Sequence, residues 1–295
     1  MGSARGITHR WIDVGGLRLH CVEAGTGPLV VLLHGFPEFW YAWRHQLPAL
    51  ADAGYRVVAP DLPGYNTSDK PPRVRDYRPS VLAQDVADLI MALGAGSAAV
   101  AGHDWGGGLA WLLAMQHPQR VERLVLLNAP HPVRFLKGLR SLRQLRRSWY
   151  ILAFQLPWLP ERLLRARDLA FIEVLWRLWS PSFDDHAHVA EIRRSMAEPG
   201  VIEATLAYYR AMFRAKFQDP SPELRAVGDR LDHPIETPTR VLCGSRDMRK
   251  EMLSGQADLF RGPYEWATVD GAGHFLHRER PDEVNRAILD WLGRS

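Results

Sequence analysis

Residues 101–108, AGHDWGGG, decide the fold of this chain. An apolar run, SAAV, precedes them, and a second apolar run, LAWLLAM, follows. Small residues two positions before and two positions after Asp104 allow a sharp turn from a strand into a helix. Such a turn is the shape of a nucleophile elbow, which presents its central side chain at the top of a sheet. The central residue here is an aspartate, so the question is which reaction uses a carboxylate at this position.

Six short apolar segments predict the strands of one sheet. Each ends in a loop with Asp, His or Asn: PLVVLLHGFP, YRVVAPD, SAAVAGHD, VERLVLLN, TRVLCGSRD and YEWATVDGAGH. Helical patterns separate several of them. In PSVLAQDVADLIMALG, Ser80 is the expected N-cap and Gly94 the expected stop, and Pro281 is expected in the first turn of the last helix. This alternation predicts an α/β fold with a mostly parallel central sheet covered by helices on both faces, and active residues at the carboxyl ends of its strands.

The alternation stops between about Pro132 and Pro234, where the chain is rich in Arg, Leu and Trp at helical spacing. We therefore predict a core domain of residues 1–132 and 235–295 and a helical cap of residues 133–234 over the strand ends. The densest basic run of the cap is RFLKGLRSLRQLRR. We interpret it as a solvated helix face, because no motif for nucleic-acid recognition accompanies it.

Composition limits the remaining possibilities. The 295 residues are 46% apolar with a net charge of +4, which is enough for a large buried core. Cys21 and Cys243 lie in strand-like apolar segments and are predicted to be buried thiols. No window approaches the 18 apolar residues of a membrane span, so a soluble, cytoplasmic protein is expected. His186 and His188 lack a visible third ligand, so we interpret them as the start of a helix on the cap surface and expect no metal.

A carboxylate nucleophile indicates a particular kind of reaction. It suits attack on an sp³ carbon that bears a leaving group. The product is an alkyl ester of Asp104, which water can cleave at the carbonyl, whereas a serine would form a stable ether. Asp104 therefore predicts an epoxide or a halide as substrate, unless it is only a polar residue at a strand end.

The order Asp104, Asp247, His274 follows the order nucleophile, acid, base of the α/β-hydrolases. With HGFPE at residues 34–38, GHDWGG at the elbow and NAPHP at 128–132, the chain resembles the epoxide hydrolase family of this superfamily over essentially its full length. The resemblance implies an α/β-hydrolase fold with a cap. It also implies that His274 activates the water that cleaves the ester and that Asp247 orients the imidazole.

The same resemblance assigns the rest of the site. The backbone N–H groups of Phe36 and Trp105 would form the oxyanion hole. Phe36, Pro37 and Trp105 would also line the substrate pocket, and the peptide before Pro37 would be cis.

Two cap segments, SWYILAFQLP and LAYYRAMF, resemble the family's tyrosine motifs. By this resemblance, Tyr150 and Tyr209 would donate hydrogen bonds to the epoxide oxygen. Tyr208, the neighbour of Tyr209, is the weaker match to the second motif. Core aromatic residues are the alternative interpretation. Ala153 replaces an aromatic residue of the first motif and is expected to widen the pocket near Tyr150.

These observations predict an epoxide hydrolase that converts an apolar epoxide into a vicinal diol. Its partners would be the epoxide and water, without a cofactor, nucleic acid or membrane, and the chain would be a monomer or a homodimer. One alternative is a haloalkane or haloacid dehalogenase, although Phe36 stands where many haloalkane dehalogenases carry Asn. The other is a catalytically silent binding protein on the same fold.

Overall fold

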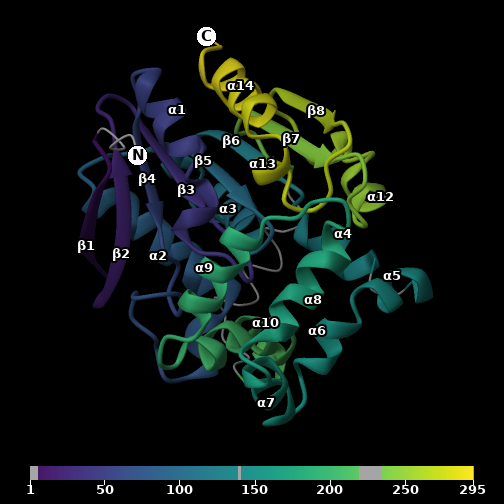
Figure 1. Ribbon diagram of the computed structural model, residues 1–295. Helices are drawn as coiled ribbons and strands as arrows, with labels where there is room; N and C mark the ends of the chain where they lie inside the picture. Colours follow the sequence, from purple (N-terminus) through teal and green to yellow (C-terminus); the bar gives the residue numbers. More distant parts are fainter. Residues whose placement is uncertain (1–5, 139–140, 219–233, 295) are drawn as a thin grey trace.

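A computed structural model describes residues 6–138, 141–218 and 234–294 of the chain. Their centre is an eight-stranded sheet in the order β1-β2-β4-β3-β5-β6-β7-β8 (Figure 1). The strands are β1 (Thr8–Val14), β2 (Leu17–Ala24), β3 (Leu29–Leu33), β4 (Arg56–Pro60), β5 (Ala98–His103), β6 (Val121–Leu127), β7 (Thr239–Gly244) and β8 (Tyr264–Val269).

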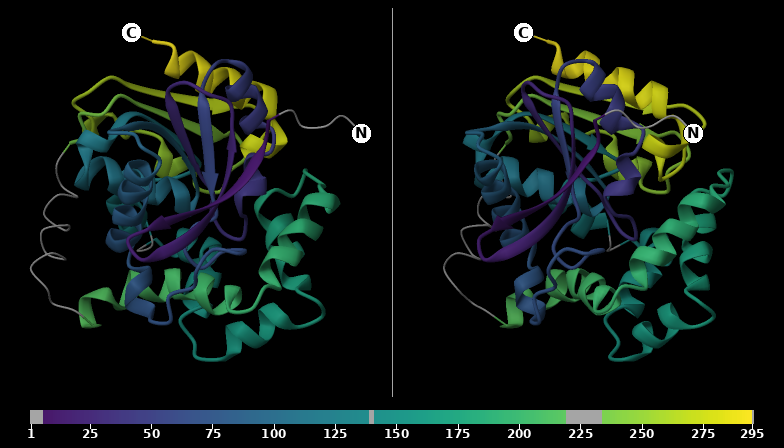
Figure 2. Two further views of the ribbon diagram at one scale, coloured as in Figure 1. Left: turned by 90° about the vertical axis from the view of Figure 1, so that its left-hand side faces the viewer. Right: turned by 60° about the vertical axis from the view of Figure 1, so that its left-hand side comes forward.

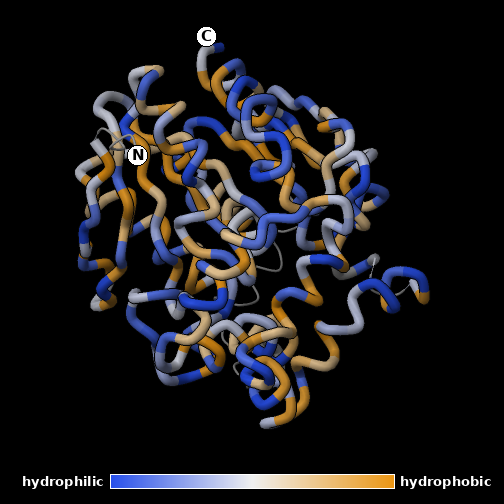
Figure 3. Tube along the Cα trace, in the orientation of Figure 1, coloured by the Kyte–Doolittle hydropathy of each residue, from blue (hydrophilic) through white to orange (hydrophobic). Residues whose placement is uncertain are grey.

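The six strands predicted from the sequence are β3 to β8, and all of them pair in parallel. β2 pairs antiparallel with β4 and with β1, so the mostly parallel sheet has one antiparallel edge. Hydrophobic residues run through the central strands (Figure 3), as expected for parallel strands buried on both faces. Cys21 on β2 and Cys243 on β7 are buried free thiols, as predicted.

Helices cover both faces of the sheet (Figure 2). On one face, Leu47 of α1 (Gln46–Asp52) and Ile288 of α14 (Pro281–Leu292) share a core with Leu32 of β3. On the other face, α2 (Pro79–Ala92) and α3 (Trp105–Gln116) pack on Val31 of β3 and Val100 of β5. The alternation of side chains along β3 thus supplies both cores. The short helices α12 (Lys250–Leu253) and α13 (Leu276–Glu279) follow β7 and β8.

In its described part, the segment between β6 and β7 forms helices that lie together at one end of the sheet (Figures 1 and 2). They are α4 (Pro132–Gly138), α5 (Leu142–Arg147), α6 (Trp149–Ala153), α7 (Leu159–Arg165), α8 (Ala170–Trp179), α9 (His186–Met196) and α10 (Val201–Gln218). Their aromatic and aliphatic side chains form a third core with Phe36 and Phe275 from the loops after β3 and β8. This core joins the cap to the carboxyl ends of the strands.

Two local predictions were inexact. Helix α2 begins at Pro79 with Arg78 as its N-cap, so Ser80 lies inside the helix, because proline suits the first helical position. Gly94, at φ +83°, follows the helix end as predicted. The basic run of the cap is divided between α4 and α5, with residues 139–140 outside the described residues. Arg134 and Arg143 of this run pair with Asp258 and Glu251.

The elbow after β5 brings a strand and a helix unusually close. Asp104 has φ +50° and ψ −117°, a conformation that L-residues rarely adopt. A Cβ on Gly106 would lie 2.2 Å from the carbonyl oxygen of Leu33, and a Cβ on Gly102 would lie 2.4 Å from that of Gly106. Only glycines allow this approach, so the elbow glycines set the position of the Asp104 side chain.

Replacing Gly106 with alanine is therefore expected to destabilise the protein by roughly 3 kcal/mol, because the added methyl overlaps backbone that cannot move aside. Gly108→Ala in the same helix is the matched control. Nothing lies within 4 Å of its Cβ position, and alanine favours the helix by about 1 kcal/mol. Urea unfolding of both variants measures the difference. Equal stability of the two would contradict this account of the elbow.

Candidate active site

Asp104 lies at the top of β5, in front of the loop that follows β3. Its Oδ1 accepts a hydrogen bond of 3.2 Å from the backbone N–H of Phe36, and its side chain remains 12% exposed. Trp105, the next residue, begins α3, and the Phe36–Pro37 peptide bond is cis. Of the two backbone N–H groups predicted for the oxyanion hole, that of Phe36 contacts Oδ1, and that of Trp105 belongs to the residue next to Asp104.

His274 and Asp247 come from the loops after β8 and β7. His274 Nδ1 donates a hydrogen bond of 2.8 Å to Asp247 Oδ2, because a carboxylate can only accept. His274 Nε2 lies 3.5 Å from Asp104 Oδ2. Asp247 is not the N-cap of α12, where Arg249 stands. The three residues are therefore arranged in the order carboxylate, imidazole, carboxylate.

The charges of this group determine its protonation. Burial alone would raise the pKa of Asp104, but the guanidinium of Arg249 and the ring of His274 hold it well below its usual range. Burial and Arg249 oppose protonation of His274, yet its contacts with Asp104 and Asp247 raise its pKa overall. Asp104 is therefore an ionised carboxylate at neutral pH, as a nucleophile must be.

Several buried groups fix the loop of His274. Asn128 donates from Nδ2 to the carbonyls of Gly273 (2.9 Å) and His274 (2.7 Å) and accepts from the N–H of Gly244. Ser180, at the end of cap helix α8, accepts from the N–H of His274 at 3.0 Å. The loop of His274 is thus held by residues of the core and of the cap.

The two predicted cap tyrosines lie in the same aromatic cluster. Tyr150 on α6 and Tyr209 on α10 are each 3% exposed, with ring centroids 6.1 Å apart. Tyr209 packs edge-on against Phe36 and Trp105, at 5.5 and 5.2 Å. Tyr208 donates its hydroxyl proton to the carbonyl of Pro63 at 2.7 Å. Its phenol is thus engaged elsewhere, which separates it from Tyr209.

Both phenols remain protonated over a wide pH range. Burial raises the pKa of Tyr150 to about 12, although the nearby Arg249 opposes the shift. Burial, with Tyr150 and Asp104 nearby, raises the pKa of Tyr209 well above its usual value. Each phenol can therefore donate a hydrogen bond at neutral pH.

Arg249 is a member of the site that the sequence did not single out. Its Nη1 donates to Asp104 Oδ2 at 2.7 Å, and its Nη2 donates to the Tyr150 hydroxyl at 3.2 Å. The side chain is 6% exposed, and its backbone N–H donates to Asp247 Oδ1. The sequence feature that could have identified Arg249 is its position two residues after Asp247, in the loop that follows a predicted strand.

A second polar cluster lies behind His274. Glu38 Oε2 faces His103 Nδ1 at 3.3 Å and His277 Nε2 at 3.6 Å, and Glu38 Oε1 accepts from His188 Nε2 at 3.0 Å. His103 Nε2 donates to the carbonyl of His274 at 2.8 Å. His186 does begin α9, but His188 is fully buried, so its predicted place on the cap surface is wrong.

Three of these residues, Glu38, His103 and His277, could together hold a metal ion, since their ligand atoms lie within 4.8 Å of one another. They are completely buried and also contact each other directly. The absence of a metal from this protein stays a prediction of the sequence.

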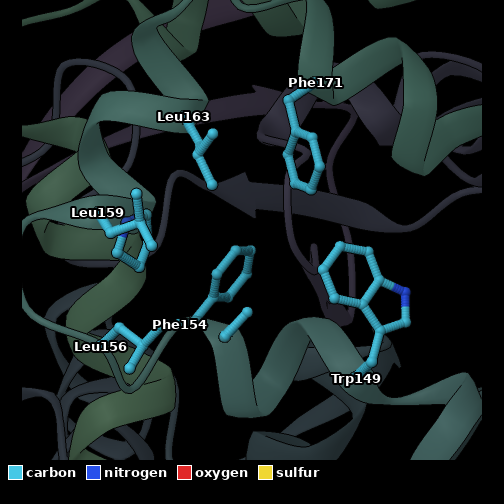
Figure 4. A pocket seen from close by; sticks show the side chains of 8 residues that line it. Trp149, Phe154, Leu156, Leu159, Leu163 and Phe171 are labelled. Atoms are coloured by element: carbon cyan, nitrogen blue, oxygen red, sulfur yellow. The ribbon is translucent and has the colours of Figure 1, made fainter.

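Ala153 borders a small apolar pocket in the cap. The pocket is lined by Trp149, Ala153, Phe154, Leu156, Leu159, Pro160, Leu163 and Phe171 (Figure 4). Phe154 also contacts the rings of Tyr150 and Tyr209, so it stands between this pocket and the aromatic cluster of the site. The predicted widening beside Tyr150 stays a prediction.

Known proteins resemble this chain in sequence and in fold. The α/β-hydrolase fold family matches residues 28–178, which is more than half of the chain. An AB hydrolase superfamily protein of Bacillus subtilis, YfhM, is 36% identical, over 97% of this chain and 98% of its own length. Epoxide hydrolase 3 of Xenopus tropicalis is also 36% identical, over 94% of this chain and 75% of the frog protein.

The crystal structure of epoxide hydrolase A from Mycobacterium thermoresistibile is similar with a TM-score of 0.85. It is 31% identical and covers 97% of this chain and 98% of its own. The chain therefore belongs to the α/β-hydrolase fold family and, within it, to the epoxide hydrolase family.

In the described part of the chain, no helix is both long and apolar enough to cross a bilayer.

Proposed function

We propose that this enzyme converts an epoxide into a vicinal diol through a covalent ester on Asp104. The observation that carries the proposal is the arrangement around the Asp104 carboxylate. His274 Nε2 lies 3.5 Å from Asp104 Oδ2, and Arg249 links the same carboxylate to the hydroxyl of Tyr150. The hydrocarbon part of the epoxide would pack against the aromatic side chains of the cap and of Phe36.

In the first step, Asp104 Oδ2 attacks one ring carbon. A C–O bond forms to the carboxylate, and the ring C–O bond breaks with its electron pair on the oxygen. Tyr150 and Tyr209 would hydrogen-bond this oxygen as charge develops, and a phenol would supply its proton. Their protonation at neutral pH supports this role.

In the second step, water cleaves the ester at its carbonyl carbon. His274 Nε2 takes a proton from this water, and Asp247 stabilises the resulting imidazolium. As the ester C–O bond breaks, the departing diol oxygen takes the proton of the new carboxyl group, so Asp104 is again a carboxylate. The imidazolium proton then restores the phenol. Ester formation removes the charge of Asp104, which is one of the two carboxylates that raise the pKa of His274. The pKa of His274 should therefore fall when the ester forms, which favours the neutral imidazole that must act as the base. The N–H of Phe36 and that of Trp105 would hold the charge on the ester oxygen.

We also propose that the enzyme needs no cofactor, since side chains and water complete both steps. We further propose that it is a cytoplasmic protein and a monomer or homodimer. The two phenols favour an epoxide substrate over the halide of the dehalogenase alternative. A departing halide would need weak N–H donors, whereas two protonated phenols are suited to an oxygen that stays attached to carbon.

The tyrosines test the proposal. Tyr150→Phe and Tyr209→Phe should each lower kcat/KM for diol formation from styrene oxide about 10- to 100-fold, and the double change more than about 10³-fold, because two donors share one oxygen. Tyr208→Phe is the matched control, since its hydroxyl is bonded to Pro63. Its kcat/KM should stay within a few-fold of the wild type.

A bromoalkane is assayed in parallel. Undiminished diol formation by the double tyrosine variant would contradict the role of the phenols. Bromide release by the wild type without diol formation from any epoxide would instead establish the dehalogenase alternative.

A further inference from the structure

Arg249 places a positive charge inside an aromatic site. Its guanidinium binds the nucleophile Asp104 with one arm and the hydroxyl of Tyr150 with the other. The rings of Phe154, Trp179 and Tyr209 contact that of Tyr150 in the same core cluster. Conversion of an uncharged epoxide into a diol through the proposed ester requires a nucleophile, a base and proton donors, and all of these are present without Arg249.

The proposed ester changes the charge balance around this guanidinium. In the free enzyme, Asp104 is paired with Arg249, and Asp247 is paired with His274. When Asp104 Oδ2 becomes an ester oxygen, its charge is lost, while Asp247 still faces the imidazole. If Tyr209 supplies the proton, the guanidinium of Arg249 then contacts a neutral ester and the neutral phenol of Tyr150, while Asp247 is bound to His274 and to the backbone N–H of Arg249. A buried guanidinium without a carboxylate in direct contact is unfavourable, so an anion from another source would stabilise it.

We propose that this anion is a carboxylate of the substrate, so that the enzyme acts on epoxides that carry an acidic group next to the ring. The inference rests on the ester mechanism proposed above. A guanidinium offers N–H donors on separate nitrogens, so it can bind two acceptors at once. Nη1 stays on Asp104, and the substrate carboxylate takes Nη2 in place of Tyr150. The released phenol then faces the ring oxygen.

This arrangement also explains how two carboxylates can approach each other. The nucleophile and the acidic group of the substrate would repel one another in a buried site, and the guanidinium between them offsets that repulsion. The substrate carboxylate takes no part in the bond changes. Asp104 Oδ2 gains the carbon, the ring oxygen receives the electron pair, and a phenol supplies the proton.

The test compares 3-phenyloxirane-2-carboxylate with its primary amide, which has the same shape and no charge. The wild-type enzyme should show a kcat/KM at least tenfold higher for the carboxylate. In Arg249→Met, the ratio of the two kcat/KM values should fall at least 100-fold. Each ratio is taken within one protein, so any effect of the change on Asp104 itself cancels.

Arg249→Lys keeps the charge but cannot contact two acceptors as the guanidinium does. Its ratio of kcat/KM values for the carboxylate and the amide should fall at least tenfold. This variant provides the test if Arg249→Met does not fold. A wild-type preference for the amide, or an unchanged ratio in the variants, would overturn the inference. Diol formation from the amide would in that case leave the proposed function intact. If the wild-type enzyme converted neither of these two compounds nor styrene oxide, the proposed function itself would be overturned.

Discussion

Asp104→Ala is expected to abolish diol formation, lowering kcat/KM by about 10⁴-fold or more. The proposed reaction forms its first bond through the carboxylate, and alanine leaves no group that can attack the ring carbon. The change also removes the charge that pairs with Arg249 at 2.7 Å. Substrate consumption and diol formation are measured together by chromatography.

Asp13→Ala is the matched control for this variant. Asp13 is an exposed residue of β1, at the edge of the sheet, and its loss should leave kcat/KM within about twofold of the wild type. Diol formation that survives in Asp104→Ala would show that water attacks the epoxide directly. The carboxylate would then not be the nucleophile.

His274→Gln is expected to separate the two steps. Ester formation needs the Asp104 carboxylate and the phenols, whereas ester cleavage needs the imidazole as a base, a contribution of about 10²- to 10⁴-fold. The variant should therefore consume about one equivalent of epoxide rapidly and then turn over at least about 10²-fold more slowly than the wild type. Rapid-quench measurements of epoxide consumption resolve the two phases.

His186→Gln is the matched control, because His186 is exposed at the start of α9. It should turn over like the wild type, without a burst. If His274→Gln lost both phases equally, the imidazole would act in the first step, and the assignment of its role would be wrong.

The parts of the fold that the sequence predicted correctly are those with a local pattern. Each parallel strand is an apolar run followed by a polar loop, and the spacing of small residues around Asp104 marks the elbow. The edge strand β1 was not predicted, because its sequence THRWIDV is largely exposed and lacks such a run. Chain order then indicated that Asp104, Asp247 and His274 would meet at one edge of the sheet.

The missed contacts join residues that are far apart in the chain. His188 was placed on the surface because DDHAH resembles a helix start, and its partner Glu38 lies 150 residues earlier. Arg249 lies in a run of charged residues that is typical of a solvated helix, yet its side chain turns into the core toward a residue 145 positions away. No periodicity within either segment indicates such a partner.

The central claim is that a carbon of the substrate becomes bonded to Asp104. The most direct test is mass spectrometry of His274→Gln quenched after one equivalent of epoxide. The account predicts a mass increase equal to that of the whole epoxide, located by proteolysis and fragmentation on Asp104. An unmodified protein, or an adduct on another residue, in a sample that has consumed its epoxide would contradict it.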